Sequence, residues 1–495
     1  MKRILIPLCI VVGSHVAYGQ RSYQFDAPDR LFVEGKELFS LKNYAGCIDK
    51  LEAYKQHSTN ADLIQEADYM LVYAAYEQGR PNADELLKDY LEEYPASRHS
   101  DEIGYMIGSV HFKRGEYEKA IFWFNEADID MLSPEQQEAY SFRLAYSLLQ
   151  TGEMEKARGY FARIEQVGDK YKEATTYYVA YIDYAMGNYN NALIEFSRLK
   201  ESPKYREQSQ YYIAQIYFIQ SKYEKVVKEG EELLSLYPDS KNNSEMYRIV
   251  GDSYYHLGDQ EKAIRMLSKY VSSTENPLRS DLYILGVCYF NKRNYSNTVN
   301  ALSRTVRQND ELTQNAYLYL GQSYLKLGDK NNARMAFEAA ATSSFDKQIK
   351  EVAMYNYALL IHETAFTGFG ESVTIFEDFL NDFPNSQYAD KVNDYLVEVY
   401  LTTKNYEAAL KSINKIKHPS TKILEAKQDI LFQLGTQAFA NVKLDDAVSL
   451  FSQAIQLGSY NMEARNDAYF WRGESYYRMG EYENAISDYR TYLNN

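Results

Sequence analysis

The feature that most constrains the fold of this chain is a regular recurrence of small residues. Thirteen positions follow one another at a mean interval of about 36.5 residues. These anchor positions are Cys47, Ala83, Ala120, Ala157, Ala192, Val226, Ala263, Thr298, Ala333, Ser372, Ala409, Ala447 and Ala485. A Gly or Ala stands twelve residues before most anchors, and a bulky apolar residue stands four after most of them, as in Gly321, Ala333 and Phe337. Periods of roughly 20 to 50 residues are typical of repeat proteins, so the sequence predicts one repeating array.

Each repeat is predicted to be a pair of antiparallel helices joined by a tight turn. The earlier small residue lies on the first helix and the anchor on the second, so that the two backbones can approach closely. A Gly followed by a polar residue separates them, as in Leu327-Gly328-Asp329 and Met479-Gly480-Glu481. Gly readily takes the left-handed conformation that ends a helix, and the polar residue can begin the next one. We therefore expect an all-α chain.

This pattern resembles the tetratricopeptide repeat. A small residue is followed three positions later by Tyr in Val250-Gly251-x2-Tyr254, Leu285-Gly286-x2-Tyr289 and Leu320-Gly321-x2-Tyr324. The Trp at the first position of the family pattern is mostly Tyr or another residue here. The resemblance covers residues 29–495 and implies a right-handed superhelical solenoid of about 13 tandem helix-turn-helix repeats.

Some repeats end in a way that is similar to bacterial envelope proteins. Tyr94-Pro95-Ala96-Ser97 and Phe383-Pro384-Asn385-Ser386 place a Pro that stops one helix before a Ser that can cap the next. The style resembles repeats in the lipoprotein of the outer-membrane β-barrel assembly machine and in the periplasmic coordinator of the Tol–Pal system. It is shared by many envelope proteins and identifies no orthologue. The assembly lipoprotein is shorter and carries a lipobox, which this chain lacks.

The first residues have the pattern of an export signal. Lys2 and Arg3 precede a short apolar stretch, and Ala17-Tyr18-Gly19 supplies the small residues that a signal peptidase accepts. We expect cleavage after Gly19, so that residues 1–19 are a signal peptide and residues 20–28 a linker. The apolar stretch is far shorter than the roughly 20 residues of a membrane span. These features predict export to the periplasm, with association to the outer membrane left open.

Composition and motifs argue against nucleic-acid binding and catalysis. The net charge is −15, whereas nucleic-acid binding depends on Lys and Arg that neutralise phosphates. His362-Glu363 begins like a zinc-protease motif, but Phe366 replaces the second His. The sequence therefore predicts a non-enzymatic protein without a cofactor or metal site. Cys47 and Cys288 are expected to be buried, unpaired small hydrophobes.

Aromatic residues recur where first helices of the resembled family face the inner groove. The chain has 49 Tyr, many more than its 22 Phe and 2 Trp. The predicted partner-binding groove consists of Tyr105, Phe112, Phe142, Tyr146, Tyr177, Tyr181, Tyr184, Tyr211, Phe218, Tyr255, Tyr283 and Phe290. Tyr offers contact area and a hydrogen bond with little entropy to lose, so such a groove suits an extended or helical protein segment.

These residues leave three interpretations open. The first is a scaffold that binds envelope proteins, including outer-membrane proteins, during outer-membrane assembly or envelope maintenance. The second is a module that binds glycan or peptidoglycan through the same rings. In the third, many of the rings bridge neighbouring repeats and are half core.

Two irregularities interrupt the repeat. Residues 364–370 lengthen one turn, either as a harmless insertion or as a contact loop. The chain ends at Asn495 without an extra polar helix to cover the last repeat, although the ends of a solenoid need such a face. We expect that the natural chain continues, that a partner covers this surface, or that Ile486 and Leu493 are simply exposed.

Overall fold

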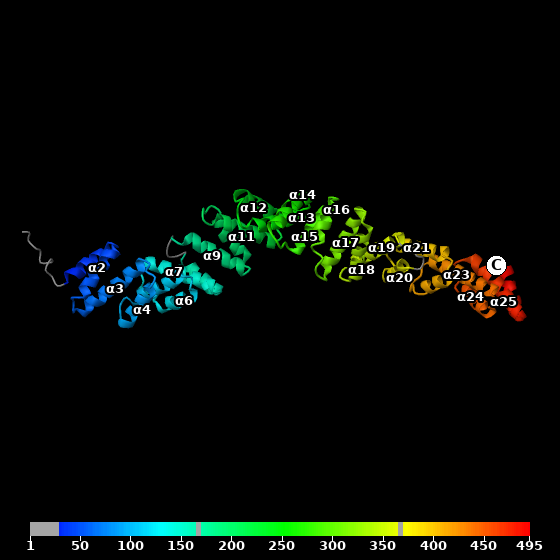
Figure 1. Cartoon of the computed structure of the whole chain (residues 1–495), viewed down its shortest axis with the longest axis horizontal. Helices are drawn as coiled ribbons and strands as arrows, with labels where there is room; N and C mark the ends of the chain where they lie inside the picture. Colours follow the sequence, from blue (N-terminus) through cyan, green and yellow to red (C-terminus); the bar gives the residue numbers. More distant parts are fainter. Residues whose placement is uncertain (1–28, 165–169, 365–369) are drawn as a thin grey trace, which may run out of the picture. The chain divides into compact units, whose positions relative to one another are not determined.

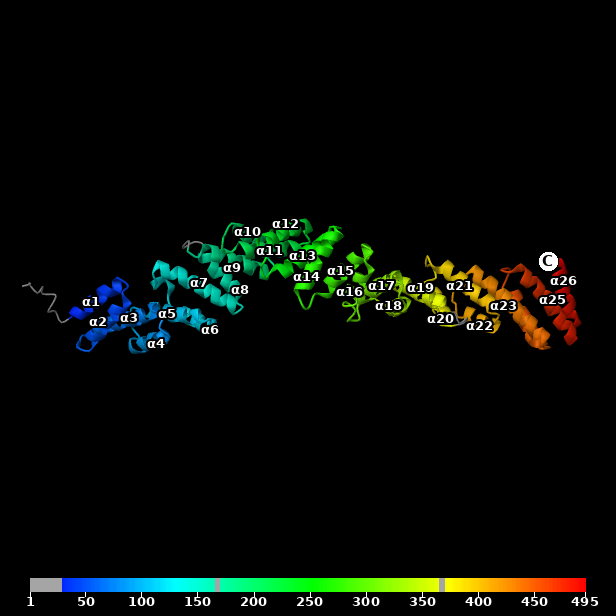
Figure 2. The same ribbon diagram turned by 45° about the horizontal axis from the view of Figure 1, so that its top comes forward.

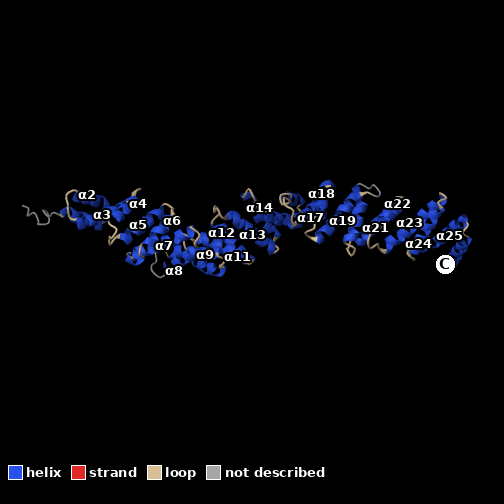
Figure 3. Cartoon of the chain, turned by 90° about the horizontal axis from the view of Figure 1, so that it is seen from below, coloured by secondary structure: helices blue, strands red, loops and turns tan. Residues whose placement is uncertain are grey.

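The computed structural model describes residues 29–164, 170–364 and 370–495. Within these ranges the chain consists of helices and connecting loops, with no strand (Figure 3). The predicted signal peptide, the linker at 20–28 and most of the long turn at 364–370 lie outside the described residues. The all-α prediction is confirmed.

The described residues form twenty-six α-helices that alternate as first and second members of thirteen pairs (Figure 1). The first helices are α1 (Arg30–Ser40), α3 (Ala61–Glu77), α5 (Ser100–Lys113), α7 (Pro134–Gln150), α9 (Lys172–Ala185), α11 (Arg206–Ile219), α13 (Asn243–His256), α15 (Arg279–Asn291), α17 (Glu311–Lys326), α19 (Lys347–Thr364), α21 (Ala389–Thr402), α23 (Thr421–Ala440) and α25 (Met462–Met479). The second helices are α2 (Tyr44–Lys55), α4 (Ala83–Glu93), α6 (Tyr117–Glu126), α8 (Met154–Ile164), α10 (Tyr189–Arg198), α12 (Tyr223–Leu236), α14 (Gln260–Ser273), α16 (Tyr295–Leu302), α18 (Lys330–Thr342), α20 (Glu371–Asp382), α22 (Tyr406–Ile413), α24 (Leu444–Gln456) and α26 (Tyr482–Asn494). A short 3-10 helix, η2, spans Ile129–Met131. The repeat number predicted from the anchor spacing is therefore confirmed.

The chain divides into two compact units. Unit 1 extends to Ile216 and unit 2 begins at Tyr217. Inside each unit a helix packs against the elements that precede and follow it, as α13 does against α12, α14 and α15 (Figure 2). Such nearest-neighbour packing is the basis of solenoid stability.

The anchor positions form the core of the pairs. All thirteen lie on second helices, and none is more than 4% exposed. The small residue on the first helix gives room for the bulky residue of the second. At Gly321, an added Cβ would lie only 2.7 Å from ring carbons of Phe337. Real Cβ atoms do not approach so closely, so Gly at this position lets the two helices meet.

The turns inside the pairs need left-handed backbone. Gly328 has φ +80°, and in pairs that lack Gly the same place is filled by another residue, such as Val442 with φ +61°. A side chain in this region collides with its own carbonyl, at a cost of about 1–2 kcal/mol. Val442 is 71% exposed, so its side chain gains little from burial.

Replacing Val442 with Gly should raise the free energy of unfolding by about 1 kcal/mol, because Gly relieves the left-handed strain. Urea denaturation followed by far-UV circular dichroism measures the gain. The reverse change, Gly328→Val, tests the same physics at the equivalent turn. An added Cβ at Gly328 meets nothing within 4 Å, so the loss of stability in Gly328→Val would come from the backbone conformation alone. A destabilised Val442→Gly would contradict the account.

Tyr recurs because it serves the repeat in two ways. Seven second helices begin with Tyr, three residues before their anchors, at Tyr44, Tyr117, Tyr189, Tyr223, Tyr295, Tyr406 and Tyr482. On first helices the hydroxyl reaches a neighbouring repeat. Tyr254 donates to a Glu231 carboxylate oxygen at 2.6 Å, and the hydroxyls of Tyr289 and Ser268 lie 3.0 Å apart. Phe could fill the same space but could not make these bonds.

A polar residue seven positions before the small residue holds the loop that follows its repeat. Gln314 in α17 is fully buried, and its Nε2 donates to the carbonyls of Ala340, Ser343 and Asp346 at 3.0 to 3.2 Å. Its Oε1 accepts from the Asp346 backbone N–H at 2.7 Å. Gln428 in α23 occupies the same position and donates to Ala454 O and Gly458 O. One side chain thus hydrogen-bonds backbone groups at the end of one helix pair and in the loop that leads to the next pair.

The cysteines and tryptophans are distributed along the array. Cys47 and Cys288 are buried and free, as expected, and burial raises the pKa of each thiol to about 11. Trp123 lies in α6, where its ring contacts Phe122 at 5.6 Å between centroids. Trp471 in α25 packs against Phe439 at 5.1 Å. Across the described residues, no helix has both the length and the hydropathy to cross a membrane.

The last helix presents apolar side chains to solvent. In α26, Ala485 is 2% exposed, but Ile486 is 45% and Leu493 79% exposed. The suggestion that more chain or a partner covers this surface stays a prediction.

Candidate partner-binding surface

In unit 1, rings from successive first helices contact one another. Phe112 on α5 packs edge-on against Tyr146 on α7, with 5.7 Å between ring centroids. Phe142 and Tyr146 both contact Tyr178 on α9, at 6.1 and 5.2 Å. The structure thus brings the predicted residues Phe112, Phe142 and Tyr146 together, and their rings join three adjacent repeats.

The ring series continues from α9 to α11 around Tyr212. Its ring lies 5.8 Å from Tyr181, 5.0 Å from Tyr184 and 5.3 Å from Tyr211. All of these rings are half-buried. The predicted residues of α9 and α11 therefore share one cluster.

Tyr177 connects the two halves of the series. Its ring contacts Tyr178 at 5.3 Å and Phe196 at 6.0 Å. Phe196 is fully buried and stacks on Tyr212 at 5.1 Å. The rings from Phe112 to Tyr211 are thus partly core and partly surface, which agrees with the interpretation that they bridge neighbouring repeats.

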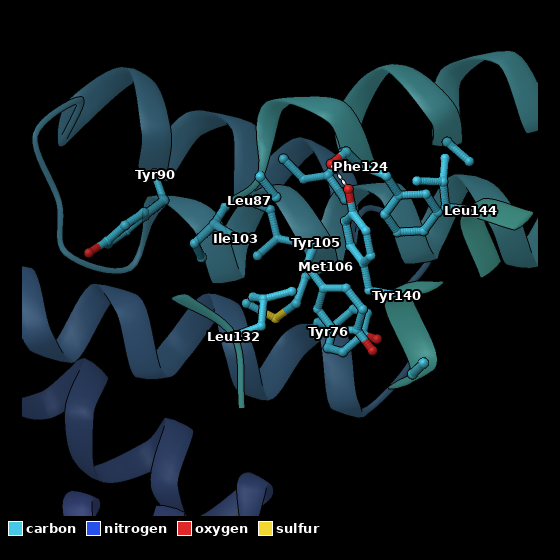
Figure 4. Packing of buried hydrophobic residues seen from close by; sticks show 14 of the residues in the cluster. Tyr76, Leu87, Tyr90, Ile103, Tyr105, Met106, Phe124, Leu132, Tyr140 and Leu144 are labelled. Atoms are coloured by element: carbon cyan, nitrogen blue, oxygen red, sulfur yellow. Dashed lines mark hydrogen bonds between the residues drawn. The ribbon is translucent and has the colours of Figure 1, made fainter. Parts of the chain in front are cut away.

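Tyr105 is placed differently from the other predicted residues. It is only 5% exposed and packs in the core with Phe124 and Tyr140 nearby (Figure 4). Its hydroxyl accepts a hydrogen bond from Arg143 Nη1 at 3.0 Å, inside a cavity of 280 Å³. Burial raises the pKa of Tyr105 to about 12, although the Arg143 charge opposes the rise. Tyr105 is therefore a cavity wall rather than an open groove residue.

The four predicted residues of unit 2 do not form one series. Tyr283 and Phe290 both contact Tyr319 on α17, at 6.2 and 5.0 Å between ring centroids. Tyr255 packs against its neighbour His256 at 5.5 Å. Phe218 lies 5.3 Å from the guanidinium carbon of Arg248. A ring series that runs across four successive first helices is thus a property of unit 1.

Electrostatics keep the rings of this surface neutral. Burial, with smaller contributions from neighbouring tyrosines, raises the pKa of Tyr178 and Tyr212 well above the ordinary value. These phenols remain protonated at any physiological pH. They can offer ring edges and hydroxyl hydrogen bonds, but no negative charge.

Sequence reasoning missed one repeat position that contributes to the surface. Tyr178, Tyr212 and Tyr319 each stand two residues before the small residue of their first helix. Their rings reach back to the preceding repeat, as the contacts above show. Arg143 occupies the same position in α7. An alignment of the repeats with one another would have shown this position, because it often holds a large aromatic residue and in one repeat holds a cation, Arg143.

The described part of the chain holds no group of three or more His, Cys, Asp or Glu side chains placed to bind a metal ion.

Three family models match separate parts of the chain. A model described as an outer membrane lipoprotein matches residues 25–115. A model of subunit 3 of the anaphase-promoting complex, or cyclosome, matches residues 256–340. A tetratricopeptide repeat model matches residues 432–495. No curated protein sequence matches the chain significantly.

Several solved structures have similar repeats. YrrB, described as a TPR protein with an unusual peptide-binding site, is 17% identical, with a TM-score of 0.34, covering 40% of this chain and 96% of that one. A tetratricopeptide repeat protein from Parabacteroides merdae is 16% identical, with a TM-score of 0.32 and coverage of 60% and 98%. Cut9–Hcn1 of the anaphase-promoting complex is 13% identical, with a TM-score of 0.26 and coverage of 94% and 93%.

Proposed function

Since the chain is a tetratricopeptide-repeat protein, a scaffold for contacts between proteins, we propose that it holds an extended or helical segment of a partner against the aromatic surface of unit 1. The observation that carries the proposal is the ring series from Phe112 to Tyr211, whose half-buried rings on four successive first helices are linked through the buried ring of Phe196. Half-buried rings held by their neighbours are already ordered before a partner arrives. Such preorganisation lowers the entropic cost of binding.

We further propose that the scaffold works in a bacterial cell envelope, by binding rather than by catalysis. The match of residues 25–115 to an outer membrane lipoprotein model supports this setting. The basic and apolar residues of the first segment, followed by Ala17-Tyr18-Gly19, also support export. Work in outer-membrane protein assembly or envelope maintenance agrees with both features. Cell fractionation with N-terminal sequencing should find a periplasmic or membrane-associated chain that begins at Gln20, and a cytoplasmic chain that begins at Met1 would contradict export.

The binding surface can be tested with a photo-cross-linking residue that keeps an aromatic ring at the substituted position. Placed at Tyr181 or Tyr184 in the whole chain, p-benzoylphenylalanine should capture a defined segment of a partner in intact cells. Placed at Phe122, which is 57% exposed on α6, it serves as the control away from the ring series. Equal capture of the same protein at all three positions would contradict the proposed surface.

A substitution experiment complements the cross-link. Changing Tyr177, Tyr181 and Tyr184 to Ala should abolish co-purification of the captured partner, because it removes the rings that join α9 to α11. Far-UV circular dichroism must show that the helix content is retained. Undiminished co-purification would refute the proposal. Saturable retention on peptidoglycan that is lost in the triple variant would instead favour a glycan-binding module.

A further inference from the structure

A polar cavity lies beside the ring series inside unit 1. It measures 280 Å³ and is lined mainly by residues of α3, α5 and α7, among them Tyr73, Tyr76, Tyr105, Gln136 and Arg143. Its other charged lining residues are two lysines and two glutamates, Lys42, Lys170, Glu77 and Glu135. Tyr171, just before α9, closes another side. Figure 4 shows Tyr76 and Tyr105 near each other in this region. Concave sites with a few convergent polar groups are typical of binding sites.

Arg143 is an unusual residue for its position in the repeat. Two residues before the small residue, other first helices of the array carry Met106, Tyr178, Tyr212, Ile249 and Tyr319. The same position also holds Ala358 and Gln433, so the repeat does not require a bulky apolar residue there, and Arg143 is the only charged residue at this position in the thirteen repeats.

The guanidinium of Arg143 is held in place without a carboxylate. Its Nη1 donates to the Tyr105 hydroxyl at 3.0 Å and to Ser109 Oγ at 2.5 Å, and its carbon lies 5.5 Å from the Tyr105 ring centroid. Among the described residues, no Asp or Glu oxygen lies within 4.0 Å of its nitrogens. Arg158 and Arg472, by contrast, each make two bonds to one carboxylate.

The unused hydrogen-bonding capacity of Arg143 points to an anionic ligand. Arg carries five N–H donors in a planar fork. The bonds to Tyr105 and Ser109 both come from one nitrogen, and the Tyr76 hydroxyl is a further side-chain partner, so part of the fork stays available to a ligand. A half-buried cation is costly unless it is paired, and a planar carboxylate is the partner that best fits the fork. The hydroxyls around it could donate further bonds to the same oxygens.

We infer that this cavity binds an acidic side chain of the partner segment, with its carboxylate on Arg143. The inference rests on the proposed function, since the rest of the segment would lie along the adjacent rings. A peptide is the occupant that we infer because the cavity adjoins the ring series: Tyr171 lines the cavity and stacks on Phe142, with 4.5 Å between the ring centroids. In this arrangement Arg143 selects an acidic residue of the partner segment, and the ring series contacts the residues on either side of it in that segment.

The test uses the whole chain and an immobilised library of randomised octapeptides. The wild-type protein should enrich Asp or Glu at one peptide position. Arg143→Gln keeps a hydrogen-bond donor near Tyr105 and Ser109 but removes the charge. It should lose the acidic preference and bind the enriched peptides about tenfold more weakly, the loss expected for one charge-assisted bond. Arg143→Glu should reverse the preference toward Lys and Arg.

Controls separate this inference from the proposed function and from misfolding. Arg198→Gln makes the same change at a 60% exposed side chain of unit 1 and should keep the acidic preference. Thermal unfolding must show that the Arg143 variants are folded, and added salt should weaken wild-type binding independently of any variant. Peptide binding with no acidic preference, or with a preference that survives in Arg143→Gln, would overturn the inference and leave the proposed function standing. Absence of peptide binding would overturn both, and Arg143-dependent retention on polygalacturonate alone would point to a sugar acid instead.

Discussion

Replacing Phe337 with Ala should lower the free energy of unfolding by about 4 kcal/mol. The ring is fully buried and lies directly against Gly321, so its loss opens a cavity between α17 and α18. Urea denaturation followed by far-UV circular dichroism measures the loss. Phe345→Ala is the matched control, because that ring is 50% exposed and should cost under about 1 kcal/mol. Equal losses at the two positions would show that the Phe337 ring is not packed between α17 and α18.

The same site allows a test of mechanism. Gly321→Ala alone should destabilise the chain by about 2 kcal/mol, since its Cβ meets the Phe337 ring. In the Phe337→Ala background the added methyl would enter the space that the ring has left, and its cost should largely vanish. Such coupling is measured by a double-mutant cycle. Additive losses would show that the two residues act independently.

Gln314→Leu should lower the free energy of unfolding by about 3 kcal/mol. The substitution keeps the bulk but leaves three backbone carbonyls and the Asp346 N–H without their partner in a buried place. The measurement is again urea denaturation of the whole chain.

Gln348→Leu is the control for this change, because Gln348 is exposed at the start of α19. It should alter stability by less than about 0.5 kcal/mol. If Gln314→Leu were equally mild, water would have to replace the lost bonds, and the role of Gln314 in holding the loop would be refuted.

Much of the fold could be predicted from the sequence because each position of the repeat meets the same physical requirement in every copy. A buried anchor such as Ala333 must be small, and the turn residue at Gly328 must tolerate left-handed backbone. These requirements limit which residue types can occupy each position. The same few residue types therefore recur at a fixed spacing, and that recurrence can be recognised in the sequence. Val442 lies in a turn that the sequence does not predict, since it takes left-handed backbone at a position where other repeats have Gly.

The loop-holding position could not be predicted, for a physical reason. The task is to reach backbone groups of the following loop, and Asp101, Glu138, Arg279, Gln314 and Gln428 all perform it. Acidic, basic and amide side chains can each pair with a backbone N–H or C=O group that the helices leave without a partner. Because residues of such different chemistry occupy this position, no recurring residue type marks it in the sequence.

The candidate surface was predicted in part. The family resemblance placed Phe112, Phe142 and Tyr146 on one face, and the structure brings them together. The resemblance could not reveal that Tyr105 is covered or that Arg143 lies beside it. Those facts depend on how α5 and α7 pack against each other, and a one-dimensional pattern does not contain that information.

The distribution of tryptophan has a practical consequence. The chain has 2 Trp, and one lies in each compact unit, Trp123 in unit 1 and Trp471 in unit 2. With the other indole changed to Phe, and with excitation at a wavelength that the 49 Tyr absorb little, the emission comes from a single known indole. The protein thus carries its own pair of optical probes, and each unit can be watched as it melts without an added dye.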